Sequence, residues 1–366
     1  MKAKNKKLNI VFFGSSIVSA YWNGAATYYR GIVKALYKMG HNVTFNEPDI
    51  YERQQHRDIA DPDYCRVKVY QSQEKEIMQL IEEASTADVI IKASGVGQHD
   101  ALLEQEVVRL KQKNNLVIFW DVDAPATLDR INNNPEDPFN QLIPLYDFIL
   151  TYGGGQPVID AYENKGAKQC IPIYNALDID THFPVASYED FNASLGFLGN
   201  RLPDREARVD DFFLVPASRL PEKRFLLGGS GWENKSMPHN VNYVGHVYTK
   251  DHNAFNCTPL AVLNISRESM AKYGYSPATR VFEAAGAAAC IITDYWEGIE
   301  VFFEPDKEIL VARNGEEVAE ILQKLTEENA RQIGHAAYKK VLENHTYENR
   351  AHLLQSVFND SLSSVQ

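Results

Sequence analysis

Short apolar runs alternate with amphipathic segments along most of the chain. Residues 8–13 (LNIVFF) are the first apolar run, residues 14–24 are a loop rich in small residues, and residues 25–39 have a helical pattern that ends at Gly40. Apolar strands that alternate with helices predict a parallel sheet, because strands covered on both faces are apolar throughout. Further strands of this first half are predicted at residues 42–45, 87–93, 115–120, 147–151 and 168–174, with helices at residues 71–84, 100–112 and 157–165.

The alternation is interrupted twice and then restarts. Residues 47–70 are polar and irregular, so we expect an exposed excursion there, and residues 175–193 mix Pro, Asp and Asn as a linker does. The second half then repeats the pattern of the first. Its strands are predicted at residues 195–198, 224–227, 241–244, 258–265, 289–294 and 308–312, with helices at residues 204–218, from residue 276, within residues 315–343 and at residues 347–365.

Length and pattern together indicate two domains. A chain of 366 residues is long for a single hydrophobic core. We therefore predict an α/β protein with two Rossmann-like, doubly wound parallel-sheet domains, residues 1–185 and residues 190–345, that face each other across a cleft. The C-terminal helix, residues 346–366, is expected to pack back on the first domain.

Composition narrows the range of partners. The chain has 37 basic and 49 acidic residues, a net charge of -12, which argues against a surface built mainly for nucleic acid or anionic membrane. The four cysteines are widely spaced without a CxxC pair, so neither a zinc ribbon nor a disulfide framework is indicated. No apolar stretch approaches the ~20 residues of a membrane span, and the first is too short for a signal segment. We expect a cytoplasmic protein.

Residues 276–294 (SPATRVFEAAGAAACIITD) predict a helix followed by a buried strand. Ser276 is a good N-cap, and Pro277 suits the first helical position. Arg280 and Glu283 are three residues apart and share one flank of the helix. A helix N-terminus with an Arg and a Glu suits a ligand that has both phosphates and hydroxyls. The alternative is an ordinary Arg–Glu pair within the helix.

Candidate residues of the first domain lie in loops after strands, where open α/β sheets bind ligands. Gly14 and Gly24 are ten residues apart and form no GxGxxG, which disfavours a dinucleotide site. Asp121 and Asp123 alternate at a strand end, so one of them can act as a base or accept a hydroxyl group's hydrogen bond. Their alternative role is to cap a helix or turn. His99 lies at another strand–helix junction.

The second domain offers basic groups at corresponding places. Arg201 and Arg205 follow Gly199 at a strand end, where guanidinium groups can neutralise a diphosphate. The alternative is a solvated helix start, because acidic residues are mixed in. His246 directly follows Gly245 at a further junction, although a lone His is more often structural.

Several of these segments resemble one family of enzymes. The second domain resembles the C-terminal domain of GT-B glycosyltransferases, specifically the spore-maturation (CgeB-like) group allied to the family 4 type retaining enzymes. The resemblance covers most of residues 115–355. The matching segments are residues 120–125 (WDVDAP), 196–201 (GFLGNR), 266–270 (SRESM), 276–294, 297–311 (EGIEVFFEPDKEILV) and 345–354 (HTYENRAHLL).

The resemblance implies a nucleotide-diphosphate-sugar donor, with UDP favoured over GDP or dTDP, held mainly by the second domain. Glu283 matches the Glu that binds the ribose hydroxyls, and Arg280 matches the diphosphate side. No bound metal is expected, because positive side chains and a helix dipole stabilise the departing diphosphate. The implied donor set is Gly14, Ser15, Gly199, Asn200, Arg201, Arg205, Gly245, His246, Ser276, Thr279, Arg280 and Glu283, and the acceptor-side candidates are Asp121, Asp123 and His99.

The sequence departs from the family at one position. Family 4 enzymes often have a second Glu eight residues before the ribose-binding one, and Tyr275 occupies that position here. The stereochemical outcome therefore stays open. The alternatives are a nucleotide-sugar epimerase or hydrolase of the same fold, and a non-catalytic sugar-binding protein. The acceptor is left open among a small molecule, a glycan and a protein, and no nucleic acid is expected.

Overall fold

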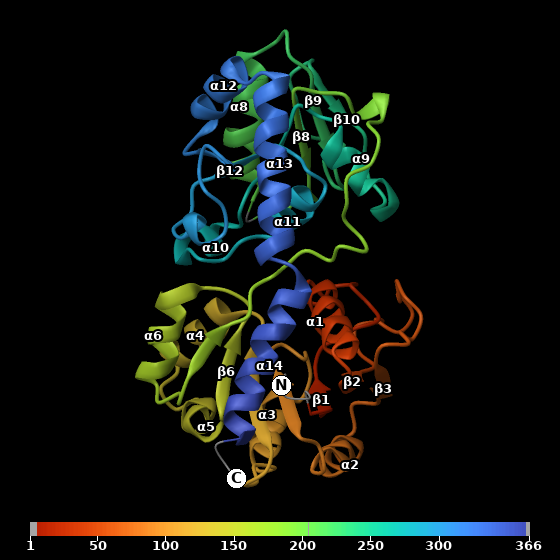
Figure 1. Cartoon of the computed structure of the whole chain (residues 1–366), viewed down its shortest axis with the longest axis vertical. Coiled ribbons are helices and arrows are strands. Elements are labelled where there is room, and N and C mark those ends of the chain that lie inside the picture. The colour runs from red at the N-terminus through yellow and green to blue at the C-terminus, as the bar shows by residue number, and fades with distance from the viewer. Residues whose placement is uncertain (1–5, 204, 364–366) are drawn as a thin grey trace, which may run out of the picture. The chain divides into compact units, whose positions relative to one another are not determined.

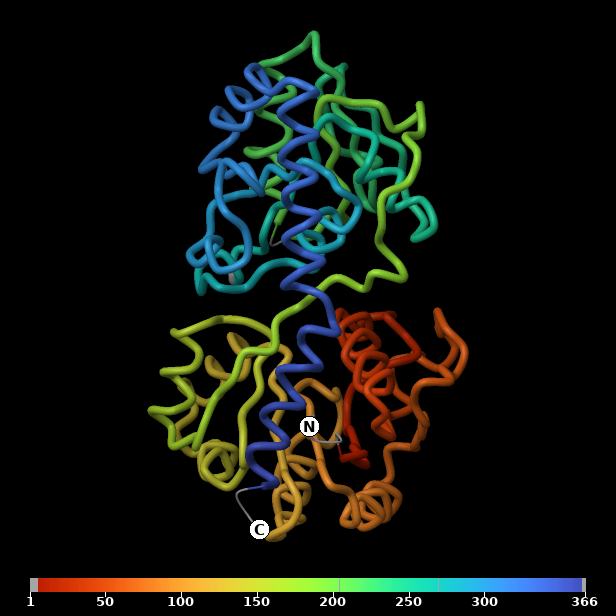
Figure 2. Tube along the Cα trace, viewed as in Figure 1, coloured from red at the N-terminus to blue at the C-terminus, as the bar shows by residue number. Residues whose placement is uncertain are grey.

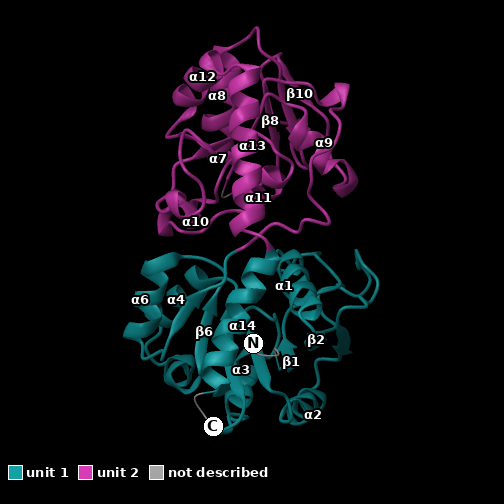
Figure 3. Ribbon diagram, viewed as in Figure 1, with its two compact units in different colours: residues 1–174, 347–366 teal, residues 175–346 magenta. Residues whose placement is uncertain are grey.

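The computed structural model describes residues 6–203 and 205–363 (Figure 1). The chain divides into two compact units (Figure 3). Unit 1 comprises Met1–Tyr174 and Tyr347–Gln366, and unit 2 comprises Asn175–Thr346.

Unit 1 is built on a seven-stranded sheet in which every neighbouring pair is parallel. The strand order is β3-β2-β1-β4-β5-β6-β7, so the direction of winding reverses at β1, as in a doubly wound fold. The strands are β1 (Asn9–Phe13), β2 (Asn42–Pro48), β3 (Arg66–Tyr70), β4 (Val89–Ala93), β5 (Leu116–Asp121), β6 (Phe148–Thr151) and β7 (Cys170–Pro172).

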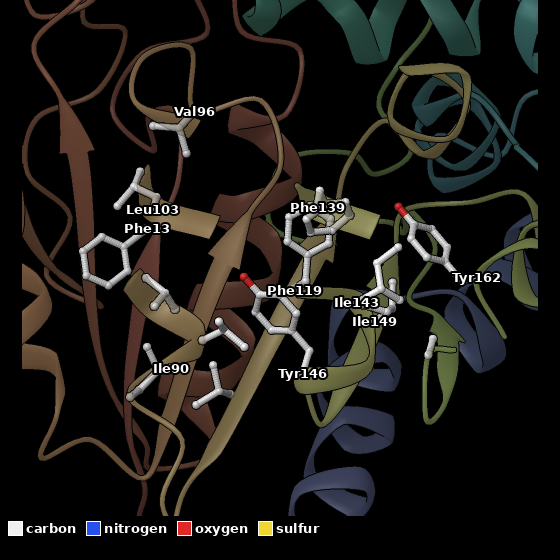
Figure 4. Packing of buried hydrophobic residues seen from close by; sticks show 14 of the residues in the cluster. Phe13, Ile90, Val96, Leu103, Phe119, Phe139, Ile143, Tyr146, Ile149 and Tyr162 are labelled. Carbon is white, nitrogen blue, oxygen red and sulfur yellow. The ribbon is translucent and has the colours of Figure 1, made fainter. Parts of the chain in front are cut away.

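Apolar side chains from the sheet and from the helices between its strands form a core on one face of unit 1 (Figure 4). The Phe119 ring of β5 lies 4.4 Å from the Phe139 ring and 5.7 Å from the Tyr146 ring, measured between centroids. The buried Tyr146 hydroxyl donates a hydrogen bond to the Glu104 carbonyl oxygen at 2.9 Å. The helices of this face are α2 (Glu74–Ala84), α3 (Asp100–Val108), α4 (Ala124–Asn133), α5 (Phe139–Leu142), the 3-10 turn Ile143–Leu145, and α6 (Gly155–Asn164).

Helices α1 (Ala26–Lys38) and α14 (Tyr347–Ser363) belong to the other side of this sheet and pack against each other. Figure 2 shows the blue C-terminal trace of α14 running beside α1. At Gly31 a Cβ atom would lie 2.3 Å from the Tyr347 ring, so the absence of a side chain there lets the two helices approach. The predicted C-terminal residues 364–366 lie outside the described part of the chain.

Unit 2 contains a six-stranded parallel sheet with the order β10-β9-β8-β11-β12-β13. It begins at Asn175, so residues 175–185, expected in the first domain, belong to unit 2. The strands are β8 (Leu195–Leu198), β9 (Phe225–Gly228), β10 (Val241–Tyr243), β11 (Ala261–Asn264), β12 (Ile291–Asp294) and β13 (Leu310–Ala312).

The helices of unit 2 differ from the prediction in their details. The helix predicted at residues 204–218 contains a π-helical stretch, and its first predicted residue, Asp204, lies outside the described residues. Two short helices before and after β11 had no predicted counterpart. The helices are α7 (Glu206–Val209), the π-helix Asp210–Leu214, α8 (Val215–Arg219), α9 (His252–Cys257), α10 (Glu268–Tyr273), α11 (Thr279–Gly286), α12 (Gly315–Lys324) and α13 (Glu327–Asn344), with 3-10 turns at Glu189–Phe191, Thr249–Asp251 and Ile299–Val301.

Among the residues that the structure describes, no helix is long and apolar enough to cross a membrane.

Candidate functional site

Three loops of unit 2 that follow strand ends are joined by hydrogen bonds and by close backbone packing. Gly229, after β9, has φ +122°, and a Cβ atom there would lie 2.2 Å from the Gly199 carbonyl oxygen after β8. The Gly229 N–H donates to the Gly245 carbonyl oxygen at 2.7 Å, and the Ser230 N–H donates to Asn200 Oδ1 at 3.0 Å. Gly199, Asn200 and Gly245 therefore shape the ligand end of this sheet through close backbone packing.

Arg201 is held by an acidic partner. Its Nε and Nη2 atoms donate to the two carboxylate oxygens of Glu206 at 2.9 and 2.7 Å, and Lys235 Nζ donates to the same carboxylate at 2.9 Å. The hydrogen bonds from Arg201 and then Lys235 lower the pKa of Glu206 to about 2. Arg205 donates to the Asn200 carbonyl oxygen at 2.8 Å. Arg201 would thus share its charge between Glu206 and any diphosphate.

The start of α11 corrects the prediction for Ser276. The helix begins at Thr279, and its N-cap is Ala278, which has no side chain to cap the first N–H groups. Ser276 is buried. It lies ahead of the helix, because the residue before a proline is biased to extended backbone and Pro277 follows it. The N-cap residue of α11 therefore makes no side-chain hydrogen bond to the first N–H groups, and helix N-termini favour anions through these N–H groups and the helix dipole.

Arg280 and Glu283 lie together in the first turns of α11, and a third group joins them. Arg280 Nη2 is 3.9 Å from Glu283 Oε2, and His182 Nε2 is 4.0 Å from Glu283 Oε1. These distances are longer than hydrogen bonds. Arg280 Nη1 and His182 Nε2 are buried and have no hydrogen-bond partner among the described residues. Two buried nitrogen atoms therefore flank one carboxylate at distances too long for hydrogen bonds, and such buried polar atoms can be satisfied by a polar ligand.

Two further residues of this group come from α9. The His252 ring lies 6.4 Å from the His182 ring, measured between centroids. Burial and then the Arg280 charge lower the pKa of His252, and the Glu283 carboxylate opposes that shift. The Oδ1 atom of Asn253 is also buried without a hydrogen-bond partner in the described chain. We call His182, His252, Asn253, Arg280 and Glu283 the α11 cluster.

Sequence reasoning missed three members of the α11 cluster. His182 lies in the segment expected to be a linker, and His252 and Asn253 lie on a helix that was not predicted. No local pattern marks these residues, because only the tertiary fold brings them to α11. His246, which the sequence did single out, is exposed, and its ring packs edge-on against Tyr248 at 4.8 Å between centroids.

The structure corrects the prediction for Asp121. Its carboxylate at the end of β5 is fully buried. It accepts hydrogen bonds from Ser94 Oγ at 2.7 Å, Thr127 Oγ1 at 3.0 Å, the Asp123 N–H at 3.0 Å and the Tyr162 hydroxyl at 2.5 Å. This carboxylate has four internal hydrogen-bond donors and no exposed surface. It therefore links strand ends and helices and is not accessible to an acceptor substrate.

Unit 2 repeats this arrangement at the corresponding place. Asp294 ends β12, is fully buried, and accepts from the N–H and Oγ of Ser266 at 3.0 and 3.2 Å. Arg208 Nη2 donates to it at 2.5 Å. Ser266 follows β11 as Ser94 follows β4, so each sheet has the same Asp–Ser pair between equivalent neighbouring strands.

The other candidate residues of unit 1 lie either at helix N-caps or at buried positions in the loop after β1. Asp123 is exposed at the N-cap of α4, and His99 is half-buried at the N-cap of α3, with Nε2 3.2 Å from the Ser72 carbonyl oxygen. Gly14 is buried, and a Cβ atom there would lie 2.5 Å from the Phe45 ring. The Ser15 hydroxyl is buried and donates to Asn23 Oδ1 at 2.8 Å. Gly14 and Ser15 thus have structural contacts within unit 1.

The chain has the GT-B fold, with two parallel-sheet units of the Rossmann type. It is similar to the solved structure of a sucrose-phosphate synthase from Thermosynechococcus elongatus, with a TM-score of 0.68, 13% identity, and coverage of 98% of this chain and 100% of that one. It is also similar to Anabaena Alr3699/HepE in complex with UDP and glucose, with a TM-score of 0.66, 13% identity, and coverage of 96% and 100%. A DNA-modifying β-glucosyltransferase gives a TM-score of 0.60 at 13% identity, with coverage of 97% and 99%.

A family model matches part of the sequence. Residues 205–356 match the family described as glycosyl transferase-like, and this segment includes Arg280 and Glu283. No curated protein matches the sequence. Within residues 6–203 and 205–363, no group of three or more His, Cys, Asp or Glu side chains is arranged to hold a metal ion.

Proposed function

We propose that the protein is a glycosyltransferase that moves a sugar from a nucleoside-diphosphate sugar to an acceptor hydroxyl. The observation that supports this most is the α11 cluster, in which Glu283 lies near buried nitrogen atoms of Arg280 and His182 that have no hydrogen-bond partner among the described residues, in the first turns of a helix. The family match over residues 205–356 and the GT-B fold agree with it. We retain the CgeB-like assignment as part of the same proposal.

Each member of the cluster has a role in this proposal. The Glu283 carboxylate accepts hydrogen bonds from the ribose hydroxyls, and Arg280 Nη1 and the first N–H groups of α11 donate to the diphosphate. His182 Nε2 donates to a ribose or phosphate oxygen. Arg201, Arg205 and the loop at Gly245 and His246 lie on other strand ends of unit 2 and extend the donor site.

The reaction follows from those contacts. The acceptor hydroxyl oxygen forms a bond to the anomeric carbon, the bond from that carbon to the diphosphate oxygen breaks, and the acceptor proton passes to a base. We propose Asp123 or His99 for this base, since Asp121 is buried. The guanidinium groups and the α11 dipole stabilise the charge that develops on the leaving diphosphate, so no metal is needed. We expect a UDP-sugar donor.

Calorimetry of nucleotide binding tests the donor site. UDP, GDP and dTDP are titrated into the wild-type protein, the Glu283→Ala variant, and the Glu300→Ala variant as a matched control, because Glu300 is exposed in the same unit. Loss of the ribose contact should weaken binding of the preferred nucleotide about tenfold or more. Equal affinities of the Glu283→Ala and Glu300→Ala proteins would refute the donor site.

A donor screen separates transfer from the other reactions of this fold. Release of nucleoside diphosphate that depends on an added acceptor supports a transferase. Turnover without an acceptor identifies a hydrolase or epimerase, and binding without turnover identifies a non-catalytic protein.

A further inference from the structure

Three exposed aromatic side chains lie at the ligand end of the unit 1 sheet. Tyr21 and Trp22 are in the loop after β1, and Tyr51 is in the loop after β2. Trp22 is 81% exposed and Tyr51 is 56% exposed. Tyr21 and Trp22 have ring centroids 6.0 Å apart in an edge-on arrangement. We call these three residues the aromatic rim.

The aromatic rim is held in place by a buried cation. Arg53 is 4% exposed, and its Nη2 donates to the Trp22 carbonyl oxygen at 3.2 Å while its Nη1 donates to the Ser15 carbonyl oxygen at 3.1 Å. The same guanidinium lies 5.2 Å from the centroid of the Tyr51 ring. The Tyr51 hydroxyl donates to the Gly97 carbonyl oxygen at 3.0 Å, so the loop after β4 also supports the rim.

The backbone under these rings is strained. Trp22 has φ +48° and Tyr51 has φ +54°, a region that bulky residues rarely occupy. Such conformations persist only where surrounding contacts impose them, and they concentrate at ligand sites. Arg53 supplies those contacts, and its buried Nε atom has no hydrogen-bond partner among the described residues. The contacts of the buried Arg53 therefore hold the exposed Trp22 and Tyr51 rings in fixed positions.

The two loops of the aromatic rim, residues 14–24 and 49–62, offer an anionic ligand no lysine and no exposed arginine outside an ion pair. The loop at residues 14–24 has no charged residue, and residues 49–62 contain four acidic residues, two arginines and no lysine. Of the two arginines, Arg53 is buried and Arg57 is ion-paired with Asp61. Arg30 of α1 pairs with Asp58 at 2.6 Å, which leaves Asp49 and Glu52 as the acidic residues of 49–62 outside these arginine pairs, and their charge disfavours phosphate, anionic lipid or nucleic acid.

The exposed rings of the aromatic rim and the polar groups beside them match a neutral sugar. The C–H face of a pyranose ring stacks on an aromatic face, and its hydroxyls donate to nearby oxygen and nitrogen atoms. Glu52 and His56 are exposed beside the rings, and the His56 ring stacks on Tyr21 at 4.1 Å between centroids. No large aliphatic side chain is exposed in residues 14–24 or 49–62, so the exposed apolar surface of these loops is aromatic.

We propose that the aromatic rim binds the sugar of a carbohydrate acceptor, with Trp22 and Tyr51 as stacking surfaces. This rests on the proposed function, and it narrows the acceptor from a small molecule, glycan or protein to a saccharide. Arg53 is a positioning residue in this proposal, because it is buried and holds the rim through the Trp22 and Ser15 carbonyl oxygens.

Fluorescence quenching isolates Trp22. The chain has four tryptophans, and Trp120, Trp232 and Trp296 are buried. Acrylamide should therefore quench mainly Trp22, and Trp22→Ala should remove the quenchable component, which identifies the signal. Quenching is measured with UDP present while maltotriose, cellotriose, chitotriose or mannotriose is added. At least one saccharide should lower the quenching constant about twofold, because stacking covers one face of the ring.

A matched pair of variants checks the origin of that protection. Tyr51→Ala should weaken the protecting saccharide about tenfold, and Tyr37→Ala, which removes an exposed tyrosine from the last turn of α1, should not. Protection by none of the four saccharides, or by phosphatidylcholine vesicles alone, would overturn the proposal, as would equal effects of the two variants. UDP calorimetry on the wild-type protein shows whether the donor site binds nucleotide. A failure of the saccharide proposal can therefore be told apart from a failure of the donor site.

Discussion

Replacing Asp121 by Ala tests whether the buried carboxylate of unit 1 is structural. The substitution removes the acceptor of four internal donors, from Ser94, Thr127, Tyr162 and the Asp123 backbone. Each buried group left unsatisfied costs about 1–3 kcal/mol. Part of this is recovered, because the Thr127 hydroxyl also lies 3.3 Å from the Asp123 carbonyl oxygen. We therefore expect unit 1 to lose about 3–5 kcal/mol of stability.

Hydrogen exchange in increasing urea measures this loss for each unit separately. Peptides from β5 and α4 should exchange at lower urea in Asp121→Ala, while peptides from β12 should not change. Asp121→Asn keeps one accepting oxygen and should cost less, about 1–2 kcal/mol. The control is Asp123→Ala, which removes an exposed neighbouring carboxylate but keeps the Asp123 N–H that Asp121 accepts, so it should cost less than Asp121→Ala. Equal exchange in Asp121→Ala and Asp123→Ala would refute the structural role.

Two further predictions concern the helix packing of unit 1 and the α11 cluster. Gly31→Ala places a Cβ atom 2.3 Å from the Tyr347 ring, so we expect a net loss of about 1–3 kcal/mol in urea unfolding of unit 1. Gly24→Ala, where no atom lies within 4 Å, is its control, and equal midpoints would contradict the packing. Burial and then Arg280 lower the pKa of His252 in the folded state, so below the ordinary value of about 6.5 the unfolded chain binds more protons. Unit 2 should therefore lose stability as the pH falls through that value. His252→Gln should weaken the dependence of the unit 2 urea midpoint on pH. Identical urea midpoints of the two proteins at every pH would contradict this role of His252.

The strands were largely predictable because their signal is local. Buried parallel strands are continuous apolar runs, and β1, β4, β5 and β12 all contain one. β3 was missed because it is an edge strand with the sequence RVKVY, whose charged residues belong to a half-exposed surface. The start of α11 was placed two residues early because Ser276 and Pro277 form a plausible cap, yet Ala278 is still extended and is the N-cap.

The candidate site was only partly accessible from sequence. Arg280 and Glu283 are three residues apart on one helix, so their proximity follows from helical geometry. His182 reaches Glu283 from a position about a hundred residues away, which no local pattern encodes. Asp121 and Asp123 look alike in sequence, but β5 ends at the buried Asp121, whereas Asp123 lies beyond the strand at the exposed N-cap of α4. Burial depends on which helices cover the sheet, so the sequence left both roles open.

The packing of α14 on α1 has a consequence for synthesis of the chain. Unit 2 is continuous in sequence and can close as soon as Thr346 has left the ribosome, whereas unit 1 lacks one of its helices until Tyr347–Ser363 are translated. During that interval the apolar surface of α1 around Gly31 has no partner and needs protection from aggregation. A premature stop after residue 346 would accordingly damage the N-terminal unit and spare the C-terminal one.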